Sequence, residues 1–317
     1  MFDRASSNSF KNRKSVGDFV DISFEIASES DRSQIESIEA SIHYLKFGEG
    51  EPLLLLHGLG QSLYTWRKLF WMLEKNFEVY AIDMPGHGCS EKAAMAYAVE
   101  DFSLSIETFM MKLGIESAHI VAFGEAATYA MDLAEQSPDK VRSLILVSPL
   151  IESGDDRGQC FSPFIASCSR FMFSQKNFDM DLESWFFDKT LVTDELLDEY
   201  FFPYRDKEMK ALLKVAGANY NDIEVKENII DIEAPMLIVR GTNDKLSPPM
   251  DQGLGGLPGL RAKAFNIRNC GWLVQEEKPE KLCAAINQFI SIGKPAKQEE
   301  PAPAEETQEE KAEEAEE

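Results

Sequence analysis

Hydrophobic positions divide the chain into alternating strand-like and helix-like stretches. Residues 53–56 form an unbroken apolar run, and residues 77–82 and 141–147 are mostly apolar stretches of strand length. Runs without polar alternation are typical of strands buried on both faces. Between two of these runs, residues 99–113 carry apolar side chains at helical spacing. The pattern predicts an α/β protein with a mostly parallel, doubly wound sheet and right-handed crossovers.

The most informative stretch lies in the middle of the chain, at residues 119–127. A β-branched apolar run there passes directly into a helical pattern, with small residues at Ala122, Gly124 and Ala126. Small residues permit a strand to turn sharply into a helix. We expect such a turn centred on Gly124, with Gly124 at positive φ.

The chain before this core is less regular. Residues 19–26 alternate enough for a strand, and residues 38–47 suggest a short hairpin. Residues 48–52 are rich in Gly and Pro, which indicates a turn. The polar residues 1–35 are otherwise expected to form an N-terminal extension.

After Pro149 the strand–helix alternation stops. Residues 150–225 contain short amphipathic pieces, with Thr193 as a candidate helix N-cap, and predict a helical cap over the sheet. The aromatic run 185–187 is expected to pack between this cap and the sheet. Strands resume at 235–239 and 262–267, and a last helix is predicted over 279–290. The predicted units are an extension (1–35), the first part of the core (36–149), the cap (150–230), the second part of the core (231–292) and an acidic disordered tail (293–317).

The charge of the chain is strongly negative. The formal net charge is −23, and residues 294–317 hold ten Glu and three Lys, so the body remains acidic without them. This balance argues against nucleic acid or an anionic membrane as the primary partner. No apolar leader and no run of membrane-spanning length occurs.

The cysteines favour a reducing compartment. Five scattered cysteines form no Cys-x-x-Cys pair and no zinc-type spacing. We therefore expect a cytoplasmic protein without a metal and without a cofactor.

Four short motifs stand at the ends of predicted strands. The motifs are His57-Gly58-Leu59-Gly60, Asp83-Met84-Pro85-Gly86-His87-Gly88-Cys89-Ser90, Gly241-Thr242-Asn243-Asp244 and Asn269-Cys270-Gly271-Trp272. Taken together and in this order, they resemble motifs of the α/β-hydrolase superfamily over about residues 38–292: the oxyanion-hole loop, the turn after the fourth strand, the turn of the catalytic acid and the turn of the catalytic histidine.

The resemblance implies a catalytic site in which two essential residues are replaced. Gly124 stands at the nucleophile position, Trp272 at the histidine position, and Asp244 remains as a vestigial acid. Glycine has no side chain to attack with, and an indole nitrogen cannot accept a proton. A register shift would leave Glu125 as the only conceivable nucleophile. We expect the Trp272 indole to donate to Asp244 in place of an imidazole.

Other parts of such a site would remain. The resemblance makes the backbone N–H groups of Leu59 and Glu125 the oxyanion donors, which could hold a ligand oxygen. His57 and His87 are expected to shape turns, while His43 and His119 are expected near strand starts, away from the catalytic edge. Cys89 and Cys270 are expected to be small buried thiols.

The sequence thus predicts a non-catalytic α/β-hydrolase-fold protein that acts as a binding or scaffold protein. Two alternatives stay open. One is an active hydrolase, for an ester or a related small substrate, that uses an unrecognised nucleophile. The other is a receptor whose capped pocket takes a small apolar ligand. The partner is accordingly expected to be a small apolar ligand or another protein.

Overall fold

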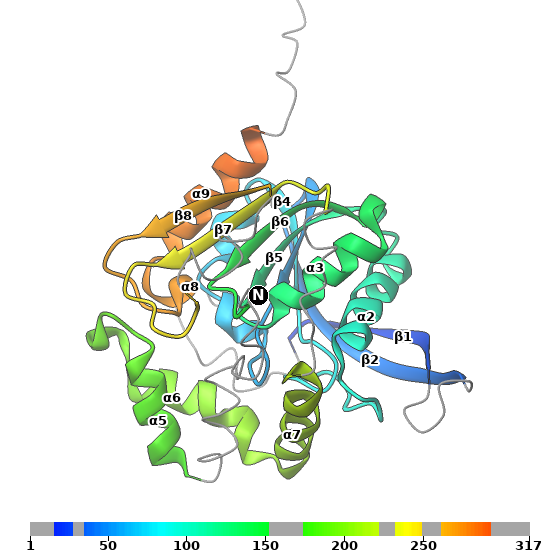
Figure 1. The fold of residues 1–317 in the computed structure, drawn as a ribbon, viewed down its shortest axis with the longest axis horizontal. Coiled ribbons are helices and arrows are strands. Elements are labelled where there is room, and N and C mark those ends of the chain that lie inside the picture. The colour runs from blue at the N-terminus through cyan, green and yellow to red at the C-terminus, as the bar shows by residue number, and fades with distance from the viewer. Residues whose placement is uncertain (1–15, 28–34, 152–173, 222–231, 249–260, 293–317) are drawn as a thin grey trace, which may run out of the picture.

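A single twisted sheet organises the molecule (Figure 1). The computed structural model describes residues 16–27, 35–151, 174–221, 232–248 and 261–292. Within them, eight strands pair in the order β1-β2-β4-β3-β5-β6-β7-β8. The strands are β1 (Asp18–Ala27), β2 (Ile35–Phe47), β3 (Glu51–Leu56), β4 (Phe77–Ile82), β5 (Ala118–Phe123), β6 (Val141–Val147), β7 (Met236–Gly241) and β8 (Ala262–Ile267).

The sheet is parallel from β4 to β8 and antiparallel at its other end. β1 pairs with β2, and β2 pairs with β4, in antiparallel register. All other pairings are parallel. The hairpin expected within residues 38–47 is wrong, because β2 runs unbroken through that stretch with β1 on one side and β4 on the other. The second half of β2 is mostly buried, because it pairs with a strand on each side.

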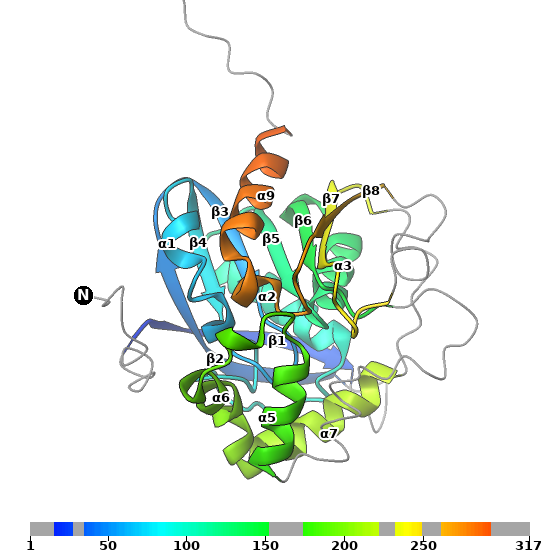
Figure 2. The ribbon, with the colours of Figure 1, turned by 90° about the vertical axis from the view of Figure 1, so that its left-hand side faces the viewer.

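Helices cover both faces of the sheet, as the strand–helix alternation predicts. α2 (Val99–Lys112) and α3 (Ala126–Gln136) lie together on one face, and the short α1 (Phe70–Leu73) lies with α9 (Pro279–Ile292) on the other (Figure 2). Between these layers, β3, β5 and β6 carry the most deeply buried aliphatic side chains. Three short helical turns lie between the larger elements: η3 (Leu63–Trp66), η4 (Pro138–Lys140) and α8 (Val274–Glu277).

A group of helices lies beyond one end of the sheet. It comprises α5 (Gln175–Ser184), η6 (Lys189–Leu191), α6 (Asp194–Phe201), η7 (Phe202–Arg205) and α7 (Lys207–Asn221) (Figure 1). Thr193 caps α6 as its sequence predicts, because its Oγ1 accepts from the Leu196 N–H at 3.2 Å. Contacts of this group with residues that follow β3 and β8 place it at the carboxyl ends of the strands. No helix among the described residues is long and apolar enough to cross a membrane.

Candidate functional site

The turn between β5 and α3 has the sharp geometry expected of it. Gly124 lies between the two elements with φ of +59°, which confirms the predicted positive φ. Ala122 and Ala126 on either side are fully buried, so the turn packs tightly against the sheet. A Cβ at Gly124 would lie 3.3 Å from Cζ2 of Trp272. The space beside Gly124 is therefore taken by the Trp272 ring.

Trp272 is locked in place by Ser148 at the end of β6. The indole Nε1 donates to the Ser148 carbonyl at 3.2 Å, and Ser148 Oγ donates to the Trp272 carbonyl at 2.8 Å. Ser148 itself has a positive φ of 45°, uncommon for a residue with a side chain. The expected bond from Trp272 to Asp244 is wrong, because the indole N–H is committed to β6.

Trp272 also joins an aromatic cluster. Its ring centroid lies 4.5 Å from that of Phe123 and 5.1 Å from that of Trp185. Trp185 and Phe186 are buried, as the sequence predicts for the aromatic run, but Phe187 is 47% exposed. The cluster therefore joins the residues after β8 and β5 to the helical group through Trp185.

Asp244 finds its partners within its own turn. Oδ1 accepts from the N–H groups of Leu246 and Ser247 at 2.9 and 3.1 Å. Arg240 Nε lies 3.9 Å from Oδ2, and the carboxylate side chain is fully buried. Burial raises the pKa of Asp244 from its ordinary 3.8, outweighing the hydrogen bonds and the arginine charge that lower it. Asp244 thus shapes its turn and is hydrogen-bonded without the indole.

The side chain of Glu125 accepts a hydrogen bond from the Leu59 N–H, a donor that was expected to face a ligand. Its side chain is 1% exposed, and its Oε2 accepts from the Leu59 N–H at 3.2 Å. A Cβ at Gly58 would lie 2.9 Å from this oxygen, so the glycine at that position leaves room for the carboxylate. The sequence predicts both residues at one site but not this contact between them.

Two buried histidines shape loops, as expected. His57 Nε2 accepts from the Met84 N–H at 3.0 Å, so its proton lies on Nδ1, which faces the Gly58 carbonyl at 2.8 Å. His87 Nδ1 bonds the Pro85 carbonyl at 2.9 Å. Burial lowers the pKa of His57, and it lowers that of His87 to about 3. Both rings are therefore neutral loop supports.

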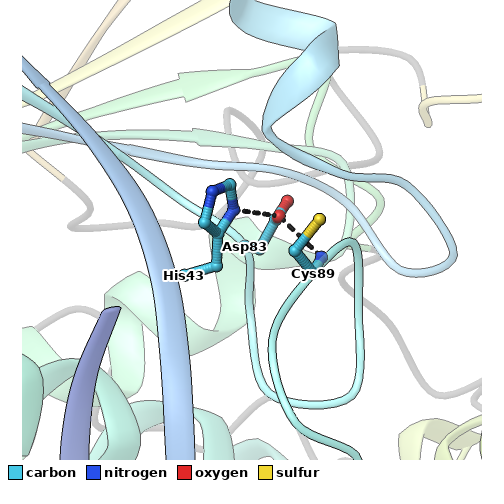
Figure 3. Close-up of side chains that lie close together, drawn as sticks. All are labelled: His43, Asp83 and Cys89. Atoms are coloured by element: carbon cyan, nitrogen blue, oxygen red, sulfur yellow. Dashed lines mark hydrogen bonds and ion pairs between the residues drawn. The ribbon is translucent and has the colours of Figure 1, made fainter. Parts of the chain in front are cut away.

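His43 lies at the carboxyl edge of the sheet, contrary to the prediction. β2 runs antiparallel to β4, so the middle of β2 meets the end of β4, and His43 lies opposite Asp83. Figure 3 shows the His43 ring, the Asp83 carboxylate and Cys89 side by side. His119, by contrast, lies at the start of β5, as expected, where its Nδ1 bonds Ser143 Oγ at 2.7 Å.

The chemistry of this second cluster follows from its hydrogen bonds. His43 Nδ1 faces Asp83 Oδ2 at 2.7 Å, and Nε2 faces the Val16 carbonyl at 2.7 Å. Both partners are acceptors, so the ring donates from both nitrogens and carries a positive charge. Burial would lower the pKa of His43, but the hydrogen bond and charge of Asp83 raise it overall. Because both ring nitrogens face oxygen acceptors, the ring forms a structural joint between Val16 and the Asp83 carboxylate.

The third member of this cluster is Cys89. Its backbone N–H donates to Asp83 Oδ2 at 2.9 Å, and its side chain is half-buried rather than fully buried as expected. The cavity that His43, Asp83 and Cys89 help to line holds about 10 Å³, room for at most one water molecule. Cys270 is buried as predicted, and burial raises the pKa of its thiol to about 12.

A polar network that the sequence does not reveal fastens the helical group to the core. Tyr200 of α6 donates to Glu276 Oε1 at 2.8 Å and bonds Thr65 Oγ1 at 2.9 Å. Glu276 is buried and ion-pairs with Arg67 and, at 3.1 Å, with Lys68. Burial raises the pKa of Glu276, but the charges and hydrogen bonds of Arg67, Lys68 and Tyr200 together lower it overall. No local motif marks these partners, because most of them are separated by more than 70 residues.

Comparisons with known proteins agree with this architecture. Residues 51–197 match the α/β-hydrolase fold family. The chain is 24% identical over 262 residues to the uncharacterized hydrolase YugF of Bacillus subtilis, covering 78% of this chain and 92% of the relative. It is 26% identical over 267 residues to a 2-hydroxy-6-oxo-6-phenylhexa-2,4-dienoate hydrolase of Comamonas testosteroni, covering 78% and 91%.

A solved structure shows the same fold. A meta-cleavage product hydrolase of Pseudomonas fluorescens superposes with a TM-score of 0.72 at 21% identity, covering 86% of this chain and 99% of that one. The strand order, the turn at Gly124 and these similarities lead to one conclusion. The chain has the α/β-hydrolase fold.

Proposed function

We propose that this protein is a pseudoenzyme that acts as a binding or scaffold protein on an α/β-hydrolase fold. The observation that carries the proposal is the position of Trp272. In the proposed assignment, Gly124 stands where the family has its nucleophile and Trp272 where it has its histidine. The Trp272 ring lies 3.3 Å from the point that a Cβ at Gly124 would occupy.

The chemistry of acyl transfer supports this proposal. The reaction needs a nucleophile, an imidazole to move its proton and donors for the developing oxyanion. Gly124 offers no nucleophilic atom, and the indole N–H is a donor committed to Ser148. The Leu59 N–H already binds Glu125. Asp244 is the only one of the three proposed triad positions that keeps a residue typical of the family.

An active hydrolase is the first alternative, and the names of the relatives favour it. Glu125 would have to be its nucleophile. Each of the chain's four histidines makes a hydrogen bond to a group other than Glu125. A glutamyl ester formed there would lack an imidazole to activate water, so the contacts favour the pseudoenzyme.

A receptor for a small apolar ligand is the second alternative. The rings of Phe123, Trp185 and Trp272 would line its pocket. Their centroid separations of 4.5 and 5.1 Å are those of rings in mutual contact. These contacts favour packing over an open pocket among these three rings.

Ester turnover tests the proposal directly. We expect no saturable hydrolysis of p-nitrophenyl acetate or butyrate, and no labelling by a serine-directed fluorophosphonate. Triad enzymes that lose triad members keep roughly 10³–10⁴-fold catalysis over water, so only activity well above that level would contradict the proposal. Loss of such activity in Glu125→Ala would identify Glu125 as the nucleophile.

A gain-of-function variant provides the complementary measurement. Gly124→Ser combined with Trp272→His restores the side chains that the family uses. We expect at best weak ester cleavage, because Glu125 still occupies the Leu59 N–H. Gly124→Ser alone should create no hydrolase and serves as the matched control.

A further inference from the structure

A buried contact joins the side chain of Glu125 to the backbone of Leu59. A buried carboxylate oxygen lies 3.2 Å from a backbone N–H at the carboxyl end of β3. We propose that Glu125 is a built-in occupant of this anion site and that it excludes acyl oxygens and free carboxylates from it. The inference rests on the proposed assignment of the Leu59 N–H as a ligand donor.

The local structure favours this arrangement. Glu125 immediately precedes α3, where a negative charge is stabilised by the helix dipole. The positive φ of Gly124 turns the chain so that residue 125, just before the helix, lies beside the loop that carries Leu59. The glycine at position 58 leaves space for the carboxylate, since a Cβ there would come within 2.9 Å of Oε2. The start of α3, the turn at Gly124 and the glycine at position 58 therefore all accommodate the contact.

The consequence concerns specificity. A carboxylate that accepts from the Leu59 N–H blocks that donor for any second oxygen, and its charge repels a second anion at the same place. Esters and carboxylic acids are thereby refused as ligands at Leu59. A ligand of this site would therefore place no acyl or carboxylate oxygen next to the Leu59 N–H.

Chemical rescue provides a sharp test. Glu125→Ala removes the group –CH₂–COO⁻, and acetate has the same size and charge as that fragment. We expect acetate to raise the melting temperature of Glu125→Ala in a saturable manner, relative to chloride at equal ionic strength. The backbone amide of Leu59 should shift in the ¹⁵N–¹H NMR spectrum along the same binding curve. In the wild-type protein, neither signal should respond to acetate.

Glu125→Gln is the matched control. Its amide oxygen can still accept from the Leu59 N–H, so we expect no response to acetate. A wild-type protein whose Leu59 amide responds to acetate as the alanine variant does would overturn the proposal. A folded Glu125→Ala without any acetate response would overturn it as well.

A second variant keeps the test decisive if Glu125→Ala does not fold. Glu125→Asp retains the charge but withdraws the carboxylate by one methylene. Hydrogen exchange of the Leu59 amide should then be at least about tenfold faster than in the wild type, and unchanged exchange would contradict the proposal. The ester assay of the preceding section is independent of these readouts, so failure of the proposed function can be told from failure of this inference.

Discussion

At the scale of single residues, two side chains fill the space around the turn at Gly124 and the loop of Leu59. Trp272 fills the place beside Gly124, and Glu125 fills the place beside Leu59. In the proposed assignment, each contact takes a place that acyl transfer would use. Because the two contacts involve different residues, they can be tested separately.

Substitution of Gly124 should be costlier than substitution of another glycine with the same backbone conformation. Gly114 has φ of +70° and nothing within 4 Å of a new Cβ, whereas a Cβ at Gly124 meets Trp272 at 3.3 Å. We expect Gly114→Ala to lose about 1–2 kcal/mol through left-handed strain alone. Gly124→Ala and Gly124→Ser should lose more, because strain and contact add. Denaturant unfolding measures both, and an unchanged midpoint for Gly124→Ser would refute the strained turn.

At the scale of elements, two polar joints hold separate parts of the fold together. The Tyr200–Glu276 contact ties α6 to the residues after β8, and the His43–Asp83 pair ties β2 to the end of β4. Both joints lie at the carboxyl edge of the sheet. Their removal should therefore loosen different elements.

Tyr200→Phe should loosen the helical group without unfolding the sheet. The variant removes a hydrogen bond to a charged carboxylate, which contributes about 1.5–3 kcal/mol. We expect faster amide exchange in α5 and α6, with little change in β3 and β5. Tyr80→Phe is the control, since its hydroxyl bonds Glu78 away from α6. Uniformly faster exchange across the sheet would contradict a local joint.

The His43–Asp83 pair should make stability depend on pH in a definite direction. The pKa of His43 is raised from 6.5, so its contribution is complete below that value and disappears as pH rises through the raised pKa. Burial raises the pKa of Asp83, but the hydrogen bonds and charges of His43 and its other neighbours together lower it below 3.8. Its contribution is therefore present above 3.8 and is lost as pH falls through the lowered pKa.

The variant His43→Ala tests the predicted direction in which stability depends on pH. Near pH 6 it should lose about 3–5 kcal/mol, the cost of breaking a buried pair. The difference from the wild type, measured by urea unfolding, should shrink as pH rises through the raised pKa of His43. Val20→Ala, an uncharged change in β1, should show no such trend. A difference that grows with pH would mean that His43 is neutral in the folded protein.

The sequence predicts strands and helices well where local pattern decides them. The buried runs of β3 to β6 and the cap of α6 by Thr193 are visible in the chain itself. The register between distant segments is not visible in the local pattern. For this reason the predicted position of His43 is wrong, and β2 is predicted as a hairpin although it is one strand. The bond of Trp272 to Ser148, rather than to Asp244, joins residues 124 apart and leaves no local signal.

At the scale of the whole molecule, the fold extends beyond the stretch with the clearest family pattern. The family match ends at residue 197, while the structural similarity covers 86% of the chain. Strands β7 and β8 and helix α9 complete the sheet and its cover after that point. The last 25 residues lie outside the described part of the structure, so the expected acidic tail remains a prediction.

Truncation after Ile292 should leave the melting temperature almost unchanged. Residues 293–317 contain many like charges and few apolar side chains, so they offer little surface to bury against the body. Thermal unfolding of the truncated and full-length proteins, at the same ionic strength, measures the difference. A decrease of more than a few degrees would mean that the tail packs on the body.

The reciprocal bonds between Ser148 and Trp272 have a consequence for how such a site can change over generations. A serine at position 124 meets the indole, and a smaller ring at position 272 leaves the Ser148 carbonyl without its donor. Each substitution alone lowers stability, and the effect of one depends on whether the other is present. This is epistasis between positions 124 and 272. In the proposed assignment, a lineage with this pair would reach a serine and a histidine only through a less stable intermediate.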